Sequence, residues 1–346
     1  MPRFENPRIT TSSYNQTLSR KDDHIDLCLK RDVQSGFKIS WDEITLPHKA
    51  LPEIDFSEIS LETEFLGHVF SSPFLISSMT GGSKKGNTLN ETLAVFAQNA
   101  NIPMGLGSQR YMIENKKDTH ARKLRKKAPK AQLWANIGAV QLNYGVSPDQ
   151  LLKLVDDLQA QALIVHCNPL QEAIQAEGDR NFSELWTKLE VVAERISVPL
   201  ILKETGCGLD PKTCKRAVNC GFDALDIAGL GGTHWGFIEG LRNKSRKELG
   251  NTFRNWGRPT PQALLEARQA VGPHFPIIAS GGIRNGLDTA RALSLGAQFC
   301  GLALPFLKAA EAGPKSLEKF FNKTCEELRI ALFCSGLKNP RELNVV

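Results

Sequence analysis

The chain has 346 residues and 41% hydrophobic content, enough to bury the core of one barrel of about 250 residues with an extension, or of two ordinary domains. Its net charge of +6 could attract a small anion but is too low to predict nucleic-acid binding. No apolar run approaches the ~20 residues that span a bilayer, so we expect no membrane partner. Eight cysteines without a CxxC pair favour reduced thiols and a cytoplasmic location.

The first 72 residues lack a regular alternation of strands and helices, and we expect them to form an N-terminal extension. A helix is predicted from about Arg20 to Asp32, where apolar residues recur among charged ones. A hairpin is predicted from Ile59–Phe65 through Gly67 to His68–Phe70, because apolar and polar side chains alternate there.

From Pro73 onward, short apolar runs alternate with amphipathic stretches every 25–35 residues or so, which is roughly the spacing of βα units. The predicted strands are Phe74–Ser77, Met104–Leu106, Gln132–Ala135, Ala162–Val165, Pro199–Leu202, Ala224–Ile227, Pro276–Ala279 and Gln298–Leu302. The predicted helices are Leu89–Asn101, Pro148–Gln161, Ser183–Ile196, Pro211–Cys220, Thr260–Val271 and Leu287–Gly296.

Eight such units close a TIM (β/α)8 barrel, which we predict for residues 73–346. A doubly wound sheet is the alternative, but it would need a Gly-x-Gly-x-x-Gly turn after its first strand, and the sequence has none. The long connection 232–259 is expected to be a lid or a binding loop. The basic stretch 116–130 is typical of a solvated helix or loop, with a polyanion site as the less favoured alternative.

The predicted strand that ends at Val165 is followed at once by His166, Asn168, Gln171 and Glu172. In barrel enzymes the chemistry lies at the carboxyl ends of the strands. Each of these side chains alone is also typical of a structural hydrogen bond, but their clustering favours a functional site. Glu172 is the candidate Mg²⁺ ligand, because one carboxylate together with phosphate oxygens of a ligand is a usual arrangement for this ion.

Two later strand ends predict a phosphate site. The run Gly281–Arg284 precedes a helix, and Ala303–Leu304 precedes a proline suited to a first helical turn. Free backbone N–H groups and helix dipoles at such ends often bind phosphate in TIM barrels. Lys203 would add a cation that could form a Schiff base, balance a carboxylate or stabilise an anionic ring. Flavin mononucleotide (FMN) fits this combination, with Lys203 beside N1 of the ring.

Further cations, at Arg20–His24 and Arg110, are candidates for a second anionic group, although the first cluster is also typical of solvated surface. Together these residues resemble one family, the type 2 isopentenyl diphosphate isomerases, from about residue 20 to 310. The stretches at 20–25 and 168–172 are specific to it, whereas the glycine-rich strand ends occur in other FMN barrels too. The matching stretches are 20–25, 78–82, 107–110, 136–138, 168–172, 177–180, 203–204, 231–233, 256–257 and 280–284.

The resemblance implies interconversion of isopentenyl and dimethylallyl diphosphate, with reduced FMN as acid/base cofactor, NADPH as reductant and Mg²⁺ on the diphosphate. It implies catalytic roles for Gln171, Lys203 and His166, and a metal ligand at Glu172. The implied FMN contacts are Ser78, Met79, Thr80, Ser108, Asn136, Lys203, Thr233, Gly282, Arg284, Ala303 and Leu304. The implied substrate contacts are Arg20, Lys21, His24, Ser108, Arg110, His166, Asn168 and Gln171.

The resemblance also implies a homo-oligomer, a tetramer or octamer, and a role for the helix and hairpin of the extension (residues 1–72) in the substrate site. The chain departs from the family pattern after Thr233, where His234 and Trp235 stand and a smaller polar residue is expected first. An FMN-dependent 2-hydroxy-acid oxidase with His234 as base is one alternative. A flavin- or phosphate-binding regulator without turnover is another, which the intact Gln171–Glu172 pair disfavours.

Overall fold

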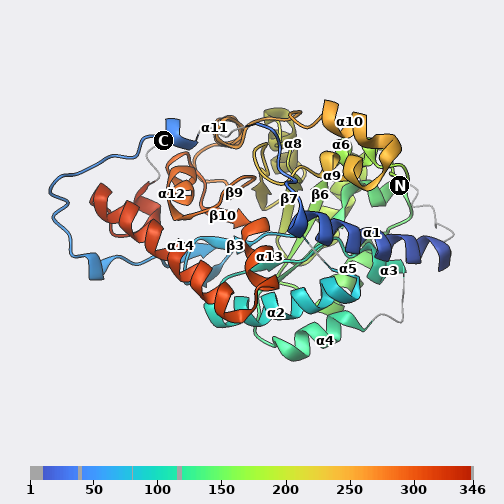
Figure 1. Cartoon of the computed structure of the whole chain (residues 1–346), viewed down its shortest axis with the longest axis horizontal. Helices are drawn as coiled ribbons and strands as arrows, with labels where there is room; N and C mark the ends of the chain where they lie inside the picture. The colour runs from blue at the N-terminus through green and yellow to red at the C-terminus, as the bar shows by residue number, and fades with distance from the viewer. Residues whose placement is uncertain (1–10, 38–40, 80, 115–118, 344–346) are drawn as a thin grey trace.

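A closed barrel of eight parallel strands forms the centre of the computed structural model, which describes residues 11–37, 41–79, 81–114 and 119–343 (Figure 1). Each strand pairs with the next along the chain, and the last pairs with the first. The predicted TIM barrel is therefore confirmed, and the doubly wound sheet is excluded. The strands are β3 Phe74–Ile76, β4 Met104–Gly105, β5 Leu133–Gly138, β6 Ala162–Cys167, β7 Leu200–Glu204, β8 Ala224–Asp226, β9 Ile277–Ser280 and β10 Phe299–Leu302.

Helices surround the barrel, and local capping signals explain where several of them begin. Ser147 and Gln150 form a reciprocal capping box at the start of α5, and Ser83 caps α2. All six helices predicted from periodicity are present, with ends that shift by a few residues. The surrounding helices are α2 Lys84–Ala100, α4 His120–Lys127, α5 Pro148–Leu158, α7 Leu185–Arg195, α8 Pro211–Asn219, α11 Thr260–Val271, α12 Gly286–Ser294, α13 Leu304–Glu311 and α14 Pro314–Ser335.

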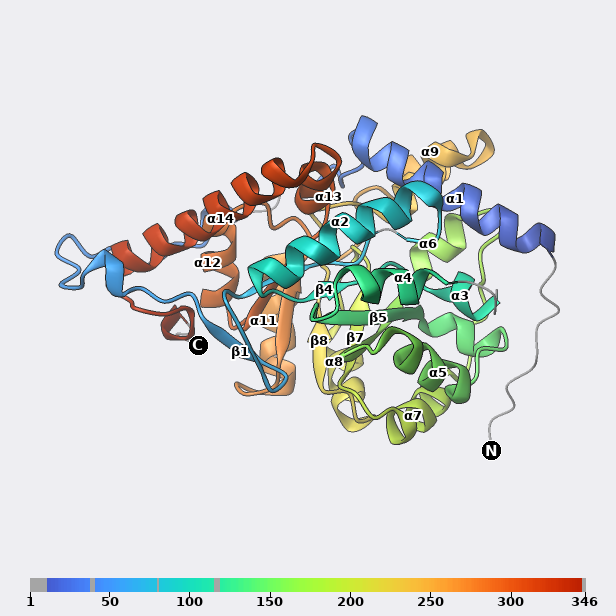
Figure 2. The same cartoon turned by 90° about the horizontal axis from the view of Figure 1, so that it is seen from below.

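The sequence interpretation left out α14, the longest of these helices, which lies along one side of the barrel against α12 and α13 (Figures 1 and 2). The sequence nevertheless contains signals for both ends of α14. The helix begins at Pro314, and it ends at Gly336, whose backbone is left-handed. Further short helical segments are η1 Trp41–Glu43, η2 Phe56–Glu58, α3 Arg110–Glu114, η3 Ala139–Asn143, α6 Pro169–Ile174 and η5 Pro340–Leu343.

The hairpin of the extension is present, but it does not reach the mouth of the barrel. Strands β1 Thr63–Phe65 and β2 His68–Phe70 pair antiparallel. Phe65 and Phe70 are buried and pack against the rings of Trp134 and Phe299, which lie near the amino ends of their strands. The hairpin therefore covers the bottom of the barrel, and the expectation that it contributes to the substrate site is wrong.

The helix of the extension, α1 Thr11–Lys30, is longer than predicted and lies at the opposite end, packed against α9 Trp235–Arg242 (Figure 2). Helix α9 belongs to the connection 232–259. That connection is not a loop, because it also forms η4 Lys244–Arg246 and α10 Lys247–Thr252. Shortly after α1 ends, the chain pairs with this connection through an antiparallel bridge between Gln34 and Thr233. These two sequence-distant segments together roof the mouth.

Arg268 on α11 ties chain segments together away from the mouth. It is 4% exposed, and its guanidinium donates to the carbonyls of Gly272, Phe275 and Gly296 and to the side chain of Gln298. Burial lowers its pKa to about 10. Four acceptors on one buried cation make this a strong structural anchor.

All eight cysteines are free thiols. Within the described residues, none of the helices combines the length and the apolar character that a membrane crossing requires.

Candidate active site

A cavity of about 440 Å³ opens at the carboxyl ends of the strands, beneath α1 and α9. Thr80 lies outside the described residues. Every other residue predicted for the site lines this cavity, although these residues come from the extension and from all parts of the barrel. They are Arg20, Lys21, His24, Ser78, Met79, Ser108, Arg110, Asn136, His166, Asn168, Gln171, Glu172, Lys203, Thr233, Gly282, Arg284, Ala303 and Leu304.

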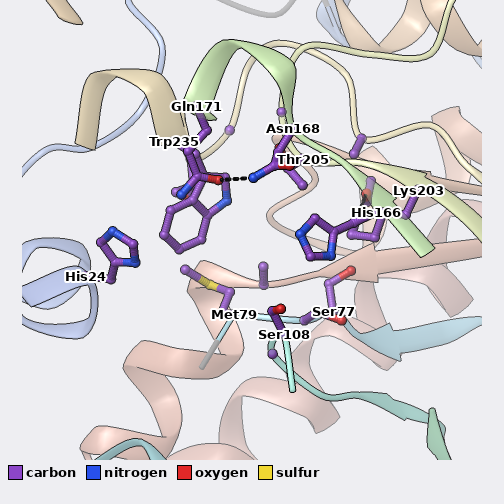
Figure 3. A pocket seen from close by; sticks show the side chains of 18 of the residues that line it. His24, Ser77, Met79, Ser108, His166, Asn168, Gln171, Lys203, Thr205 and Trp235 are labelled. Atoms are coloured by element: carbon purple, nitrogen blue, oxygen red, sulfur yellow. Dashed lines mark hydrogen bonds between the residues drawn. The ribbon is translucent and has the colours of Figure 1, made fainter. Parts of the chain in front are cut away.

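Figure 3 shows how the side chains divide the cavity: His24 and Trp235 lie on one side, and His166 and Lys203 lie on the other. Met79 and Ser108 lie between them on the wall formed by the first two strand ends. The rings of His24 and Trp235 meet edge to face, with centroids 5.1 Å apart. The cavity thus has two aromatic rings at one side and the side chains of His166 and Lys203 at the other.

Helix α1 is fastened to the barrel by its basic residues. Lys21 Nζ donates to the Ser108 carbonyl at 2.6 Å and lies 4.1 Å from the centre of the Tyr111 ring. A Cβ on Gly82 would lie 2.9 Å from that Nζ, so glycine at this position makes room for the lysine. Arg20 lies 4.0 Å from the half-exposed carboxylate of Glu177. The cluster at residues 20–24 is therefore part of the cavity wall.

Glu239 on α9 is the main residue that the sequence interpretation missed. It is 1% exposed, and it accepts hydrogen bonds from His24 Nε2 at 2.9 Å and from Gln171 Nε2 at 3.0 Å. Its other oxygen accepts from Arg242. Burial opposes its charge, but the hydrogen bond from His24, the charge of Arg242 and the hydrogen bond from Gln171 hold its pKa at about 2. One carboxylate thus joins the extension, the β6 loop and α9.

His166 is held as a neutral imidazole at the end of β6. Its Nδ1 lies 2.7 Å from Asn136 Oδ1, which fixes the proton on Nδ1 and leaves a lone pair on Nε2. Burial, together with the positive charges of Lys203 and Lys21, lowers its pKa to about 4. At neutral pH the ring is therefore uncharged.

Glu172 is buried at the start of α6, and the chain wraps around it. One carboxylate oxygen accepts from Asn168 Nδ2 at 2.9 Å and the other from the Asp179 backbone N–H at 2.8 Å. Asn168 Nδ2 also lies 3.2 Å from Gln171 Oε1 (Figure 3). Burial raises the pKa of Glu172, in spite of these two donors. A Cβ on Gly178 would lie only 1.9 Å from the Glu172 carbonyl oxygen, so only glycine allows the loop to fold back this closely.

Arg110 is not held as a free cation in this structure. Its guanidinium pairs with Glu114 one helical turn away and with Asp179 of the loop around Glu172. Asp179 in turn accepts from Gln141 Nε2 at 3.0 Å. The arginine that the resemblance assigns to the diphosphate and the carboxylate that it assigns to the metal are therefore joined through one residue, Asp179.

The predicted phosphate end consists of the loops after β8, β9 and β10. Arg284 holds them together, because its guanidinium donates to the carbonyls of Gly282 and Gly231 and to Gln34 of the extension. A Cβ on Gly232 would lie 2.5 Å from the Gly282 nitrogen, so two loops meet backbone to backbone. At the start of α13, Ala303 offers no side-chain cap. The start of α13 is therefore left without a side-chain cap, and Ala303 and Leu304 line the cavity there, as a phosphate site at a helix start requires.

Lys203 forms a buried ion pair with Asp226, a carboxylate that the sequence interpretation did not name. Its Nζ lies 2.7 Å from Asp226 Oδ2 and 3.3 Å from Ser280 Oγ. The neighbouring Glu204 points away and accepts backbone N–H groups of residues 205–208. Neighbouring residues of a strand point to opposite faces, which is why Lys203 and Glu204 have different partners.

The described residues fit FMN in three respects. First, among them the buried hydroxyls of Ser77 and Ser78, on the cavity wall, lack a hydrogen-bond partner. Second, the uncapped start of α13 provides donors for a phosphate. Third, Cβ atoms on Gly105 and Gly301 would lie 2.6 and 2.4 Å from the hydroxyls of Ser78 and Ser77, so these glycines keep the floor of the cavity open.

The fit to Mg²⁺ is narrower. Among the described residues, no cluster of three His, Cys, Asp or Glu side chains could hold a metal ion. Glu172 supplies a carboxylate at the cavity, and the buried Oδ1 of Asn168 has no hydrogen-bond partner there. Two oxygen donors suit a hard cation only if a ligand completes the coordination.

His234 does not line the cavity within the described part of the chain. It is 1% exposed, and its Nδ1 accepts the Phe237 backbone N–H at 3.0 Å, which caps α9. His234 is therefore a capping residue, and the alternative that makes it the base of a hydroxy-acid oxidase loses its support.

Curated proteins that resemble this chain nearly end to end decide the family. A protein of Nostoc sp. named isopentenyl-diphosphate delta-isomerase is 44% identical, with 96% of each chain covered. Proteins with the same name from Rickettsia bellii and Hydrogenovibrio crunogenus are 42% and 43% identical, and 94% of this chain and 96% and 95% of theirs are covered. The chain belongs to the isopentenyl-diphosphate delta-isomerase family.

Residues 138–345 also match the FMN-dependent dehydrogenase family, so the chain is an FMN barrel as well as an isomerase relative. The combination confirms the resemblance to the type 2, flavin-dependent branch.

Solved structures of hydroxy-acid-oxidising flavoproteins share the fold. A lactate oxidase of Pediococcus acidilactici superposes with a TM-score of 0.69 at 17% identity, covering 99% of this chain and 94% of its own. A flavocytochrome b2 variant gives 0.66 at 20% identity, with 96% and 83% covered. At such identities the likeness supports the barrel alone.

Proposed function

We propose that this enzyme interconverts isopentenyl and dimethylallyl diphosphate, with reduced FMN as acid/base cofactor and Mg²⁺ on the diphosphate. The observation that carries the proposal is the convergence, in one cavity, of the family motifs from α1, β6 and β7. When bound in its reduced form, FMN would supply a proton donor and acceptor beside the alkene. NADPH is the proposed reductant.

The phosphate of FMN would be held at the start of α13 and by the loops that Arg284 joins, with Gly282, Ala303 and Leu304 as backbone donors. The ring would lie over Lys203, near Ser78, Ser108 and Asn136. The serine hydroxyls that lack a partner among the described residues would then gain one.

The diphosphate would lie under α1. Lys21, Arg20 and Arg110 line the cavity, and so does His166, whose Nε2 is the acceptor nitrogen of its ring. Binding a diphosphate would favour protonation of His166, since a nearby anion stabilises the imidazolium. Arg110 would exchange part of its pairing with Asp179 and Glu114 for phosphate oxygens. Glu172 would hold Mg²⁺ together with those oxygens.

The hydrocarbon part would lie between Met79, Trp235 and Gln171. Proton addition to an alkene places positive charge on carbon, so water must be excluded from it. Trp235 and His24 close that side of the cavity, and Gln171, which lines it, is fixed by Glu239 at its Nε2 and by Asn168 at its Oε1. The residues thus position the alkene and shield it, and Gln171, Lys203 and His166 are the groups proposed to touch the reacting components.

The test is an anaerobic assay of the purified enzyme with isopentenyl diphosphate, FMN, NADPH and Mg²⁺, in which dimethylallyl diphosphate is measured. NADPH and Mg²⁺ are each omitted in parallel reactions. Product that is lost on either omission is expected. Product that persists without Mg²⁺ would contradict the role of Glu172. A yellow, FMN-bound protein without any product would contradict the proposed reaction, and lactate-dependent flavin reduction would then be tested.

A further inference from the structure

The floor of the cavity contains a group of charges whose balance the proposed function does not explain. Lys203 on β7 and Asp226 on β8 are register partners on adjacent strands, and their side chains form an ion pair at 2.7 Å. Ser280 on β9 donates to the second oxygen of Asp226 and lies 3.3 Å from Lys203 Nζ. The three residues are 6%, 1% and 3% exposed. Only Lys203 and Ser280 border the cavity, so Asp226 lies behind them.

An ammonium buried in this way cannot be treated as a bare positive charge. A carboxylate at contact distance in a low-dielectric interior cancels most of its field, and the pair acts as a dipole whose positive end faces the cavity. Ser280 fixes Asp226 by its hydroxyl and so keeps the dipole in one direction.

The chemistry of the proposed function requires such a balance. A positive charge under the ring favours the reduced, electron-rich flavin, which the reaction needs. A full, uncompensated positive charge would also repel the positive charge that develops on the substrate carbon on the other face of the ring. A lysine paired with an aspartate still favours the reduced flavin, and it repels the positive charge on the substrate carbon less.

We propose that Asp226, fixed by Ser280, is the counter-ion that limits the positive charge of Lys203 at the flavin ring. Asp226 is a positioning residue, because it acts through Lys203 and does not touch the ring. The inference rests on the proposed function in one respect: FMN must lie over Lys203. It does not depend on which substrate is isomerised.

The experiment measures the affinity of the full-length apoprotein for oxidised FMN and for dithionite-reduced FMN, by fluorescence and absorbance titration under anaerobic conditions. The ratio of the two dissociation constants reports how strongly the floor favours the reduced ring. For Asp226→Asn we expect this ratio to shift about tenfold or more toward reduced FMN, which equals about 30 mV or more for a two-electron couple. The matched control is Asp223→Asn, which removes the same charge just before the amino end of β8. It should leave the ratio within twofold of wild type.

A second pair of variants decides the matter if Asp226→Asn does not fold. Lys203→Met alone should shift the ratio toward oxidised FMN, because Asp226 then stands uncompensated. Lys203→Met combined with Asp226→Leu replaces the ion pair by apolar groups, a change that buried pairs often tolerate. Compared with Lys203→Met, the double variant should shift the ratio of dissociation constants back toward reduced FMN by at least tenfold.

An unchanged ratio in Asp226→Asn, or a double variant no better than Lys203→Met, would overturn the proposal. Wild-type protein that binds no FMN would overturn this proposal and the proposed function together. Wild-type protein that binds FMN but makes no dimethylallyl diphosphate would overturn only the proposed function, because the titration needs no substrate.

Discussion

Glu239 holds residues that line the cavity without lining it itself, and we expect Glu239→Gln to impair catalysis strongly. The carboxylate accepts hydrogen bonds from His24 and Gln171 and contacts Arg242. The glutamine amide keeps one acceptor oxygen, but its NH2 group replaces the other oxygen and faces a side chain that itself donates a hydrogen bond. A hydrogen bond to a charged group contributes about 1.5–3 kcal/mol, so kcat/KM should fall roughly 10–150-fold.

A double-mutant cycle with His24→Ala tests the mechanism of this loss. If His24 acts in the position that Glu239 gives it, the double variant should be little worse than either single variant, with a coupling energy of about 1.5 kcal/mol or more. Steady-state kcat and KM are measured for all four proteins. Costs that add to within about 0.5 kcal/mol would refute the reasoning. Glu177→Gln is the control, because that half-exposed carboxylate contacts the same Arg242 and should cost less than about threefold.

Three further predictions concern the metal loop, the histidine and the anchor on α11. Gly178→Ala places a Cβ 1.9 Å from the Glu172 carbonyl, so half-maximal activation should need about tenfold more Mg²⁺, and an unchanged Mg²⁺ titration would contradict the packing argument. The pKa of His166 is lowered to about 4 in the folded chain. As the pH falls, this histidine therefore takes up its proton in the unfolded chain before it does so in the folded one. Apoprotein stability should therefore be complete above pH 6.5 and be lost as pH falls to 4, by about 1–3 kcal/mol. Urea unfolding of His166→Gln should show a weaker pH dependence in that range, and an equal dependence would remove His166 as the cause. Arg268→Met removes the donor that four acceptors share, so the free energy of unfolding in urea should fall by about 3 kcal/mol or more. The kcat of the folded enzyme should stay within about twofold of wild type. A large loss of kcat would contradict the purely structural role of Arg268.

The order of the barrel strands and most of their positions followed from the sequence, because hydrophobic periodicity is a local property. Strand ends such as Val165–Glu172 combined an apolar run with polar groups, and in a parallel barrel all such ends meet at one mouth. The same logic brought Lys203, Gly282 and Ala303 to one cavity without any knowledge of their contacts. The family motifs then named the chemistry.

The sequence alone determined the barrel, the family and many of the residues that border the cavity. Only the tertiary structure decided which charges pair. His24 and Glu239 are 215 residues apart and meet because α1 packs on α9, a contact for which neither helix carries a local signal. The pairing of Lys203 with Asp226 depends on strand register, and the place of the hairpin depends on which end of the barrel leaves an apolar opening for Phe65 and Phe70. Such pairings are set by the free energy of burying whole surfaces, which no short stretch of sequence contains.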